Sequence, residues 1–352
     1  MKSKNNGKKY SYFWAVAYGL LLTGYVVYTL LDTFVLPRDL VHIDDIPKHT
    51  YEASSSFTLS DTSLEELTVT ENTADTSAFE VQATKAETPE ATTAEIITQP
   101  AAGEPEEPII TDTSYESSSI FIKITNERLD DTEAYIAEVI IKDPSLLKAG
   151  LAHDSFGRNL KQYTSAIAAN NNAILAINGD YYGFRESGYV MRNGYLYRTK
   201  GRSGEQCDGM AIFNDGHMEV YKEPDIDAQS LADRGAVQIF CFGPALLKDS
   251  EILVNENSEV EMSWNDNPRT AIGQISPLHY LFVVSDGRTE ESKGLSLNSL
   301  ARLMKDKGCD TAYNLDGGGS ATMWFMGEVV NVPTDGRRYG ERGISDIVYI
   351  GE

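Results

Sequence analysis

The hydrophobic residues of this chain are unevenly distributed, and their pattern divides it into three parts. Residues 10–31 form one predominantly apolar run without a charge. At about 1.5 Å per helical residue, this run can cross the roughly 30 Å apolar core of a bilayer. Residues 32–115 show no sustained apolar period, whereas residues 116–352 contain short apolar runs broken by Gly, Asn and Asp. We therefore expect a transmembrane helix, a linker and one folded domain.

The C-terminal part is expected to be rich in strands. Runs of β-branched, aromatic and aliphatic residues between turn residues predict twelve strands, at 120–124, 134–141, 173–177, 209–213, 218–221, 238–242, 270–275, 280–285, 311–315, 321–326, 328–332 and 347–350. Helices are expected over 161–172 and 296–308, where Ser296 can cap the second helix and Gly308 can end it. The mixture predicts an α+β domain of twisted mixed or antiparallel sheets with a few packed helices.

The charges beside the apolar run predict its orientation. Residues 1–9 carry four lysines, and aspartates follow the run. By the positive-inside rule, residues 1–9 form a cytoplasmic tail, residues 10–31 a signal anchor, and the domain lies outside the cell. A cleaved secretory signal is the alternative, although the run is longer than a usual signal core. Both alternatives export the domain.

The net charge of −23 is concentrated in the linker. Residues 51–115 hold 14 acidic residues against Lys85 alone, and the segment 32–115 is rich in Thr, Ser, Glu and Ala. Such a composition cannot bury enough apolar surface to offset chain entropy, so we expect a disordered, self-repelling stalk. The chain has no basic run able to follow a nucleic-acid backbone, which excludes that class of partner.

Cysteine and histidine give no pattern of a metal site. Cys207, Cys241 and Cys309 are too few and too scattered for a disulfide framework or a zinc cluster. Buried thiols are expected, and one disulfide with one free thiol is the alternative. The five histidines share no ligand spacing, so none is assigned to a metal or a catalytic triad.

The main candidate for chemistry is the loop Asn314-Leu315-Asp316-Gly317-Gly318-Gly319-Ser320, directly after an apolar strand. A P-loop would continue into a helix, but residues 321–326 favour a strand. A serine-hydrolase elbow needs a glycine two residues after Ser320, where Thr322 stands. Consecutive glycines let backbone N–H groups approach an anion, so a phosphate cradle beside Asp316 is expected. A bulged hairpin is the structural alternative.

Further polar groups follow other apolar strands. Asn178, Gly179 and Asp180 follow residues 173–177, and Asp286, Gly287 and Arg288 follow residues 280–285. Each alone is a common hairpin turn, although additional polar residues such as Glu186 and Glu290 lie close by in sequence. Arg269 and Thr270 begin another apolar strand, where a guanidinium can bind phosphate through two hydrogen bonds.

Together these motifs resemble the phosphodiester glycosidase family over roughly residues 174–350. The most specific segments are Asp286-Gly287 with Thr289-Glu290, the helix near Leu297, the run NLDGGGSAT at 314–322, and RTAIG at 269–273. Residues 178–188 resemble the family's Asn-Gly loop with a following Ser-Gly, and 342–348 its closing strand. Residues 189–194 depart from the family's cysteine-bearing glycine segment, so the identity of the sugar is not carried over.

The resemblance implies hydrolysis of a sugar 1-phosphodiester at the anomeric C–O bond. A phosphomonoester is a good leaving group, so charge stabilisation can contribute more than general-acid assistance. Asp316 is the first candidate for the general base or transition-state stabiliser, with Asp286 and Asp180 as alternates. Whether the reaction inverts or retains depends on the separation of the carboxylates. The expected substrate-binding residues are Asn178, Gly179, Glu186, Arg269, Thr270, Arg288, Asn314, Gly317, Gly318, Gly319 and Ser320, with the arginines and glycine amides on phosphate and the asparagines on sugar hydroxyls.

The expected partners are a phosphodiester-linked glycan of the cell envelope or an exopolysaccharide, and the membrane through residues 10–31. No cofactor is expected to be required, and a structural divalent cation at the acidic loops is left open. Two other classes stay open as well. One is a non-catalytic envelope protein that binds anionic glycopolymer, and the other is a metal-dependent phosphodiesterase that uses the aspartates as cation ligands.

Overall fold

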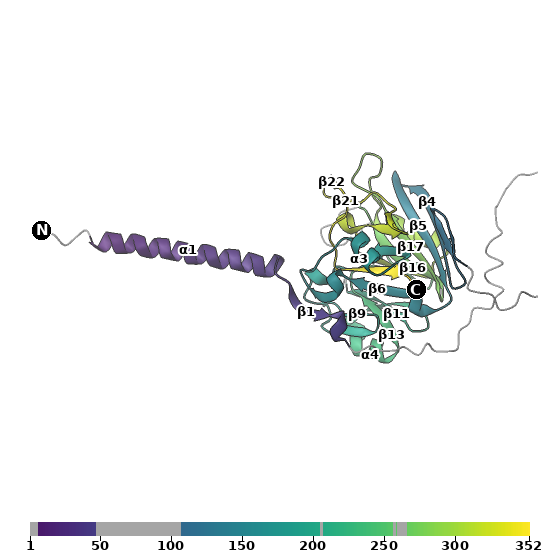
Figure 1. The fold of residues 1–352 in the computed structure, drawn as a ribbon, viewed down its shortest axis with the longest axis horizontal. Coiled ribbons are helices and arrows are strands. Elements are labelled where there is room, and N and C mark those ends of the chain that lie inside the picture. The colour runs from purple at the N-terminus through teal and green to yellow at the C-terminus, as the bar shows by residue number, and fades with distance from the viewer. Residues whose placement is uncertain (1–5, 47–106, 205–206, 256–257, 259–265) are drawn as a thin grey trace, which may run out of the picture.

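Helix α1 (Asn6–Phe34) stands apart from the strand-rich remainder of the chain (Figure 1). The computed structural model describes residues 6–46, 107–204, 207–255, 258 and 266–352. Within Tyr12–Phe34 of α1, an 18-residue window has a mean hydropathy of 1.6, and none of this window is buried. By length and composition this helix fits a membrane span or an N-terminal signal sequence.

The chain enters the domain shortly after this helix. Strand β1 (Arg38–His42) pairs antiparallel with β7 (Ser155–Arg158), and the 3-10 turn η1 (Ile43–Asp45) follows. The expected linker at 32–115 is therefore wrong at both ends, because β2 (Ile109–Ile110) and β3 (Ser114–Glu116) are also paired strands. These strands are only two to five residues long, and the partner of β1 is distant in sequence, so no local period indicates them.

The acidic segment follows β1 and η1 in the sequence and precedes β2. Both of these strands are paired with strands of the domain. Residues 47–106 lie outside the described residues, and so does the expectation that they form a disordered stalk.

The largest sheet has nine strands, and every neighbouring pair in it is antiparallel. Its strand order is β15-β14-β18-β16-β17-β5-β4-β3-β2. The strands not yet given are β15 (Glu251–Ile252), β14 (Ala245–Lys248), β18 (Thr311–Leu315), β16 (Thr270–Ser276), β17 (His279–Ser285), β5 (Thr132–Ile141) and β4 (Ile120–Leu129).

Two five-stranded antiparallel sheets complete the framework. One has the order β10-β9-β13-β11-β12, with β9 (Val190–Arg192), β10 (Tyr195–Arg198), β11 (Asp208–Phe213), β12 (Met218–Lys222) and β13 (Ala236–Phe240). The other has the order β20-β19-β8-β23-β6, with β6 (Leu147–Leu151), β8 (Leu175–Asn178), β19 (Met323–Phe325), β20 (Glu328–Val329) and β23 (Asp346–Ile350). A separate hairpin pairs β21 (Thr334–Asp335) with β22 (Arg338–Tyr339).

Among the residues that the structure describes, three short helices lie in the domain. α3 (Thr164–Asn170) and α5 (Leu297–Asp306) confirm the two expected helices, although α3 is shorter than predicted. Ser296 caps α5 by accepting a hydrogen bond from the Ser299 N–H, and Gly308 has a φ of +88° beyond its end. The six-residue α4 (Ala228–Asp233) was not expected from the sequence. The remaining 3-10 turns are η2 (Pro144–Leu146), η3 (Ala152–Asp154), η4 (Tyr182–Phe184), η5 (Glu223–Asp225) and η6 (Gly318–Ser320).

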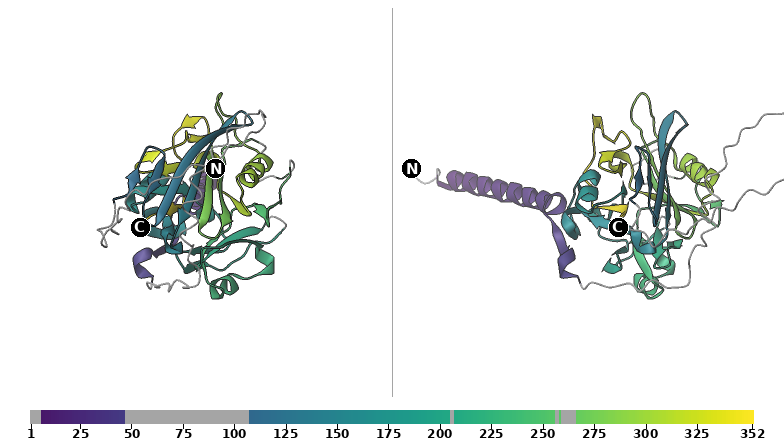
Figure 2. Two further views of the ribbon diagram at one scale, coloured as in Figure 1. Left: turned by 90° about the vertical axis from the view of Figure 1, so that its right-hand side faces the viewer. Right: turned by 45° about the vertical axis from the view of Figure 1, so that its right-hand side comes forward.

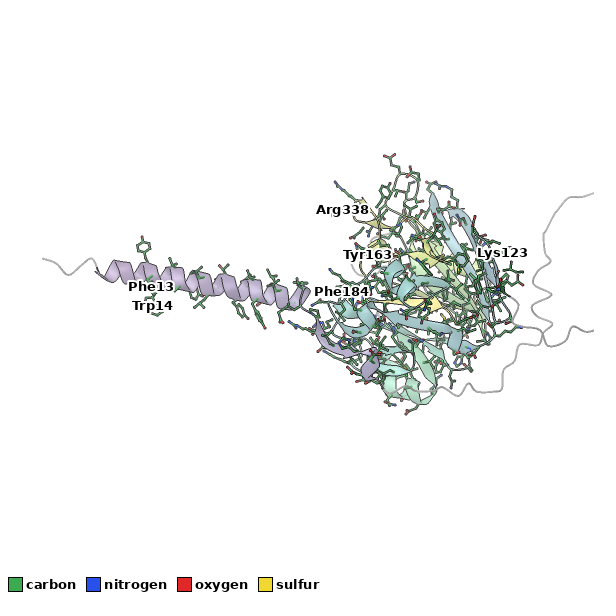
Figure 3. All side chains as sticks on the ribbon, viewed as in Figure 1. Phe13, Trp14, Lys123, Tyr163, Phe184 and Arg338 are labelled. Carbon is green, nitrogen blue, oxygen red and sulfur yellow. The ribbon has the colours of Figure 1, made fainter. Side chains whose placement is uncertain are left out.

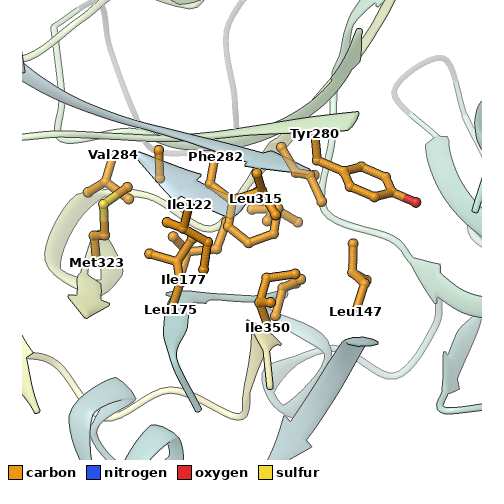
Figure 4. Packing of buried hydrophobic residues seen from close by; sticks show 14 of the residues in the cluster. Ile122, Leu147, Leu175, Ile177, Tyr280, Phe282, Val284, Leu315, Met323 and Ile350 are labelled. Carbon is orange, nitrogen blue, oxygen red and sulfur yellow. The ribbon is translucent and has the colours of Figure 1, made fainter. Parts of the chain in front are cut away.

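The central strands of the large sheet are buried on both faces. In β17, Tyr280, Phe282 and Val284 belong to the central core, where they meet Ile177 and Ile350 from the third sheet (Figure 4). The alternate residues of β17 face a second cluster that includes the apolar face of α5. Figure 2 shows α5 on the side of the large sheet away from α1. Burial on two faces explains why β17 reads as a continuous apolar run.

All twelve expected strands are present, and the α+β class is confirmed. The disulfide alternative is wrong, because Cys207, Cys241 and Cys309 are all buried and free. As free buried thiols they act as small apolar side chains.

Candidate active site

Two strand ends from different sheets meet at the side chain of Asn178. Its Nδ2 donates to the Asp316 carbonyl oxygen at 2.5 Å, and its Oδ1 accepts from Thr270 Oγ1 at 2.7 Å and from the Thr322 N–H at 3.1 Å. Asn178 and Thr270 are completely buried. Both residues thus join β8, β16 and the glycine loop.

A cavity of about 640 Å³ lies above this junction. Two buried carboxylates, Asp180 and Asp316, line it together with Ser320. Its wall is aromatic and its rim is charged. The other lining residues are Lys161, Gln162, Tyr163, Ala166, Tyr181, Phe184, Asp335, Glu341, Arg342, Gly343, Ile344 and Ser345. The cavity therefore combines paired carboxylates, aromatic rings and cationic side chains, as a site for an anionic sugar derivative requires.

Asp316 is a buried carboxylate of this cavity, and its surroundings alter its acidity. Burial raises its pKa to about 6, against the opposing effects of a hydrogen bond from Ser320 and the positive charge of Arg342. The negative charge of Asp180 adds to the increase. A carboxylate with a pKa just below neutrality is ionised at pH 7 and is still basic enough to accept a proton during a reaction.

Asp180 has the opposite character. Burial opposes its ionisation, but Arg192 and the N–H of Cys241 outweigh burial, and its pKa lies below the ordinary value. The Cys241 N–H donates to Oδ2 at 2.7 Å, and the Tyr181 N–H donates to Oδ1 at 2.5 Å. Environments that separate the pKa values of two neighbouring carboxylates are how a site assigns them different roles.

Arg192 is buried beside Asp180 and fixes the position of this carboxylate. It is 1% exposed, and its guanidinium lies between Asp180 and Asp346, 2.7 Å from Asp346 Oδ2. It also lies 3.8 Å from the centroid of the Phe240 ring. A Cβ at Gly179 would come within 2.6 Å of Asp346 Oδ1, so only glycine fits between the two aspartates.

Two of the three glycines in the loop, Gly318 and Gly319, allow guanidinium groups to approach the backbone. A Cβ at Gly319 would lie 2.7 Å from Nε of Arg342, and a Cβ at Gly318 would lie 2.8 Å from Nη2 of Arg288. The Gly318 N–H donates to the Pro268 carbonyl and is not directed at a ligand. The Gly318 amide is therefore not part of the expected cradle, and the guanidinium groups of Arg288 and Arg342 place positive charge beside the loop.

Arg342 is a site residue that the sequence did not single out. It lines the cavity, lies over Gly319, and donates from Nε and Nη2 to Asp335 Oδ1 at 2.9 and 2.7 Å. The position of Arg342 beside the loop depends on the β21-β22 hairpin, and only folding of the chain brings this hairpin next to the loop. The only sequence signal was its place at the start of the segment resembling the family's closing strand.

Arg269 and Arg288 lie beside and beneath the loop but do not line the cavity. Arg269 is buried and donates from Nε to the Leu295 carbonyl at 2.9 Å, and burial lowers its pKa to about 10. Arg288 donates to Asn267 Oδ1 at 3.1 Å, and burial followed by the charge of Arg342 lowers its pKa. Both add positive potential near the loop.

Three other expected site residues lie apart from the cavity. Asp286 accepts hydrogen bonds from the Val332 N–H at 2.8 Å and from Tyr135 Oη at 3.3 Å, and burial raises its pKa. Asn314 donates to the Gly243 carbonyl at 2.8 Å. Glu186 is exposed and pairs with Arg158 at 2.9 Å. Their sequence context resembles that of Asp180, but the fold directs them elsewhere.

Tyr181 and Phe184 form the aromatic wall. Their rings stack with centroids 4.9 Å apart, and Arg185 lies over the Tyr181 ring at 5.6 Å. An aromatic face of this kind can stack against the apolar face of a sugar ring. No group of three or more His, Cys, Asp or Glu side chains is arranged to hold a metal ion among the residues that the structure describes.

Comparison with known proteins places this geometry in a family. A family model described as phosphodiester glycosidase (NAGPA) matches residues 171–351. The Bacillus subtilis SPbeta prophage-derived uncharacterized protein YomE is 32% identical over 204 residues, covering 55% of this chain and 30% of that protein. Mouse N-acetylglucosamine-1-phosphodiester alpha-N-acetylglucosaminidase is 29% identical over 102 residues, covering 26% of this chain and 20% of that protein. The chain thus spans less than a third of the length of these curated relatives.

A solved structure supports the same grouping. The zebrafish N-acetylglucosamine-1-phosphodiester alpha-N-acetylglucosaminidase catalytic domain, auto-inhibited by its pro-peptide, has a TM-score of 0.52 and 25% identity, covering 68% of this chain and 86% of that chain. The family match includes Asp180, Asp316 and Arg342, which surround the cavity. The chain belongs to the phosphodiester glycosidase family.

Proposed function

We propose that this chain is a membrane-anchored glycosidase that hydrolyses the anomeric C–O bond of a sugar 1-phosphodiester outside the cytoplasm. The observation that carries the proposal is the placement of Asp180 and Asp316 in one cavity with Arg342, in surroundings that separate the pKa values of the two carboxylates. The names of the mouse and zebrafish relatives describe a reaction on such a linkage.

Each part of the cavity has a role in this reaction. The sugar ring stacks on Tyr181 and Phe184, and the phosphate lies toward Arg342 and Lys161. Bidentate arginine contacts suit phosphate oxygens, because the planar guanidinium matches their geometry. This orientation places the anomeric carbon near the two carboxylates.

The carboxylates then divide the chemistry. Asp316 accepts a proton from the attacking water, whose oxygen forms the new bond to the anomeric carbon. Asp180 stays ionised and stabilises the positive charge that develops on the sugar ring. The anomeric C–O bond breaks, and its electron pair leaves on the phosphomonoester oxygen, where Arg342 stabilises the negative charge. Free sugar and a phosphomonoester are the products.

The location of the domain outside the cytoplasm supports a substrate of the cell envelope or an exopolysaccharide. α1 is exposed and apolar, and the lysines before it favour a cytoplasmic N-terminus. An exported domain meets envelope polymers in which sugars are joined by phosphodiesters. N-acetylglucosamine is the first sugar to test, because the relatives are named for it.

The test is product analysis with the purified full chain in detergent. The substrates are methyl phosphodiesters of N-acetylglucosamine, glucose and galactose, and the readouts are free reducing sugar and methyl phosphate. Release of both from at least one substrate, and no release by Asp316→Asn, supports the proposal. Binding without release indicates a non-catalytic glycopolymer-binding protein. Sugar 1-phosphate formed only without chelator indicates a metal-dependent phosphodiesterase.

A further inference from the structure

A very short segment joins the membrane helix to the catalytic domain. Only residues 35–37 separate α1 from β1, and a fully extended chain from Phe34 to Arg38 spans at most about 14 Å. Asn159 fastens the junction, since its Nδ2 donates to the Leu36 carbonyl at 2.9 Å and to the Thr33 carbonyl at 3.2 Å. Arg38 also forms an ion pair with Asp32. The domain is therefore held at the surface into which the helix inserts.

The loop that contains Asn159 contacts both the end of α1 and the wall of the cavity. The Asn159 N–H donates to the Gly183 carbonyl at 3.0 Å, and Gly183 precedes Phe184 in the cavity wall. Two residues after Asn159, Lys161 begins the stretch that includes Tyr163 and lines the cavity from the other direction. The end of the helix and the rim of the active site thus share one short loop.

The exposed residues of this rim lie on the helix side of the domain. Figure 3 shows Phe184, Tyr163 and Arg338 on the side from which α1 emerges, and Lys123 on the opposite side. Tyr163 is 54% exposed and Tyr339 is 71% exposed, and Arg337 and Arg338 beside it are exposed as well. Tyrosine favours the interface of a bilayer, and arginine is attracted to anionic lipid headgroups.

Acidic residues restrict where the domain can meet anionic lipid. On the rim, Asp335 pairs with Arg342, and Glu341 accepts hydrogen bonds from Ser165. At the other end of this face, Asp39 and the turn η1 are exposed and acidic. The β21-β22 hairpin, with Arg337 and Arg338, is thus the part of this face suited to contact with anionic headgroups.

From these placements we infer that the cavity opens toward the bilayer and takes its substrate from the membrane, as a sugar 1-phosphodiester whose second ester is a lipid. This inference rests on the proposed function and specifies its substrate class. A polymer segment far from the membrane cannot reach a cavity held at the bilayer surface, whereas a lipid anchor holds the phosphate within a few ångströms of the headgroup plane. The hairpin then contacts the headgroups beside the bound substrate.

The test uses the full chain reconstituted in vesicles of phosphatidylcholine and phosphatidylglycerol at 3:1. Two probes carry the best sugar of the product assay on the same phosphate, one as a hexadecyl ester in the vesicles and one as a methyl ester in solution. At equal bulk concentration, the hexadecyl ester is expected to be hydrolysed at least tenfold faster when it shares vesicles with the protein. Placing it in separate vesicles is expected to remove this advantage.

Charge reversal separates membrane contact from catalysis. The double variant Arg337→Glu with Arg338→Glu is expected to slow hydrolysis of the hexadecyl ester at least threefold and to leave the methyl ester unchanged. Lys123→Glu, on the opposite side, is the matched control and is expected to change neither rate. Equal rates on the two esters, with the methyl ester cleaved, overturn the inference and leave the proposed function intact. Cleavage of neither ester overturns the proposed function itself.

Discussion

Asp180 and Asp316 line the same cavity, yet the pKa of Asp180 lies below the ordinary value and that of Asp316 is raised to about 6. The difference comes from their neighbours. Asp180 lies beside the buried guanidinium of Arg192 and accepts hydrogen bonds from two backbone N–H groups. At Asp316, the effect of burial on the pKa outweighs the groups that lower it. The two carboxylates consequently differ in their capacity to exchange a proton near neutral pH.

Replacement of Asp316 by Asn is expected to lower kcat/KM by about 100-fold or more, the usual contribution of a positioned base. The fold should be retained, because the variant removes a buried charge without changing the size of the side chain. Steady-state kinetics with the methyl phosphodiester and circular dichroism measure the two effects. Asp286→Asn is the matched control, since Asp286 is also buried but lies outside the cavity. A folded Asp286→Asn variant with a greater loss than Asp316→Asn would reverse the assignment.

The pH dependence of kcat/KM should show the titration of Asp316. The ionised form accepts the proton, so activity is expected to fall tenfold per pH unit below about pH 6 and to be constant above it. The positive charge of Arg342 lowers the pKa of Asp316. Arg342→Gln should therefore move this acidic limb to higher pH, and Arg342→Lys, which keeps the charge, should move it less. If Arg342→Gln does not shift the acidic limb of the pH profile, a group other than Asp316 controls that limb.

Gly319 is expected to act through Arg342. A Cβ at this position would lie 2.7 Å from the guanidinium, so Gly319→Ala should displace Arg342 and raise KM for the phosphodiester. The effect should be absent when Arg342 is already replaced by Met. A double-mutant cycle on kcat/KM isolates this coupling. Additive effects of the two substitutions would indicate that Gly319 acts independently.

Arg192 is expected to stabilise the fold beneath the site. Arg192→Met leaves Asp180 and Asp346 buried without their counter-charge, and removal of one partner of a buried ion pair costs about 3–5 kcal/mol. Urea denaturation followed by circular dichroism measures the loss. Lys293→Met, which breaks an exposed pair with Asp131, is the control and should leave the midpoint unchanged. An unchanged midpoint for Arg192→Met would contradict the stabilising role of this buried cluster.

The sequence predicts twelve of the strands, the family and the aspartates Asp180 and Asp316, because these depend on local patterns. It could not rank Asp180 above Asp286, since both follow an apolar strand and a turn. That ranking depends on β8 lying beside the glycine loop, where Asn178 bonds the Asp316 carbonyl. Arg342 was likewise indicated only by its place in the closing segment, because its contact with Gly319 requires the hairpin that follows β20.

The position of β1 was the other feature that local sequence patterns could not predict. Five residues with mixed polarity do not indicate a strand, and only pairing with β7 makes them one. That pairing determines how close the domain lies to α1.

The central claim is cleavage of the anomeric C–O bond, and the position of the incoming oxygen tests it most directly. The full chain is incubated with the methyl phosphodiester of its preferred sugar in water enriched in oxygen-18, and the methyl phosphate is examined by mass spectrometry. Attack at the anomeric carbon leaves every oxygen of the methyl phosphate unlabelled, which is the predicted result. One oxygen-18 atom in the methyl phosphate would show attack at phosphorus and contradict the roles given to Asp316 and Asp180.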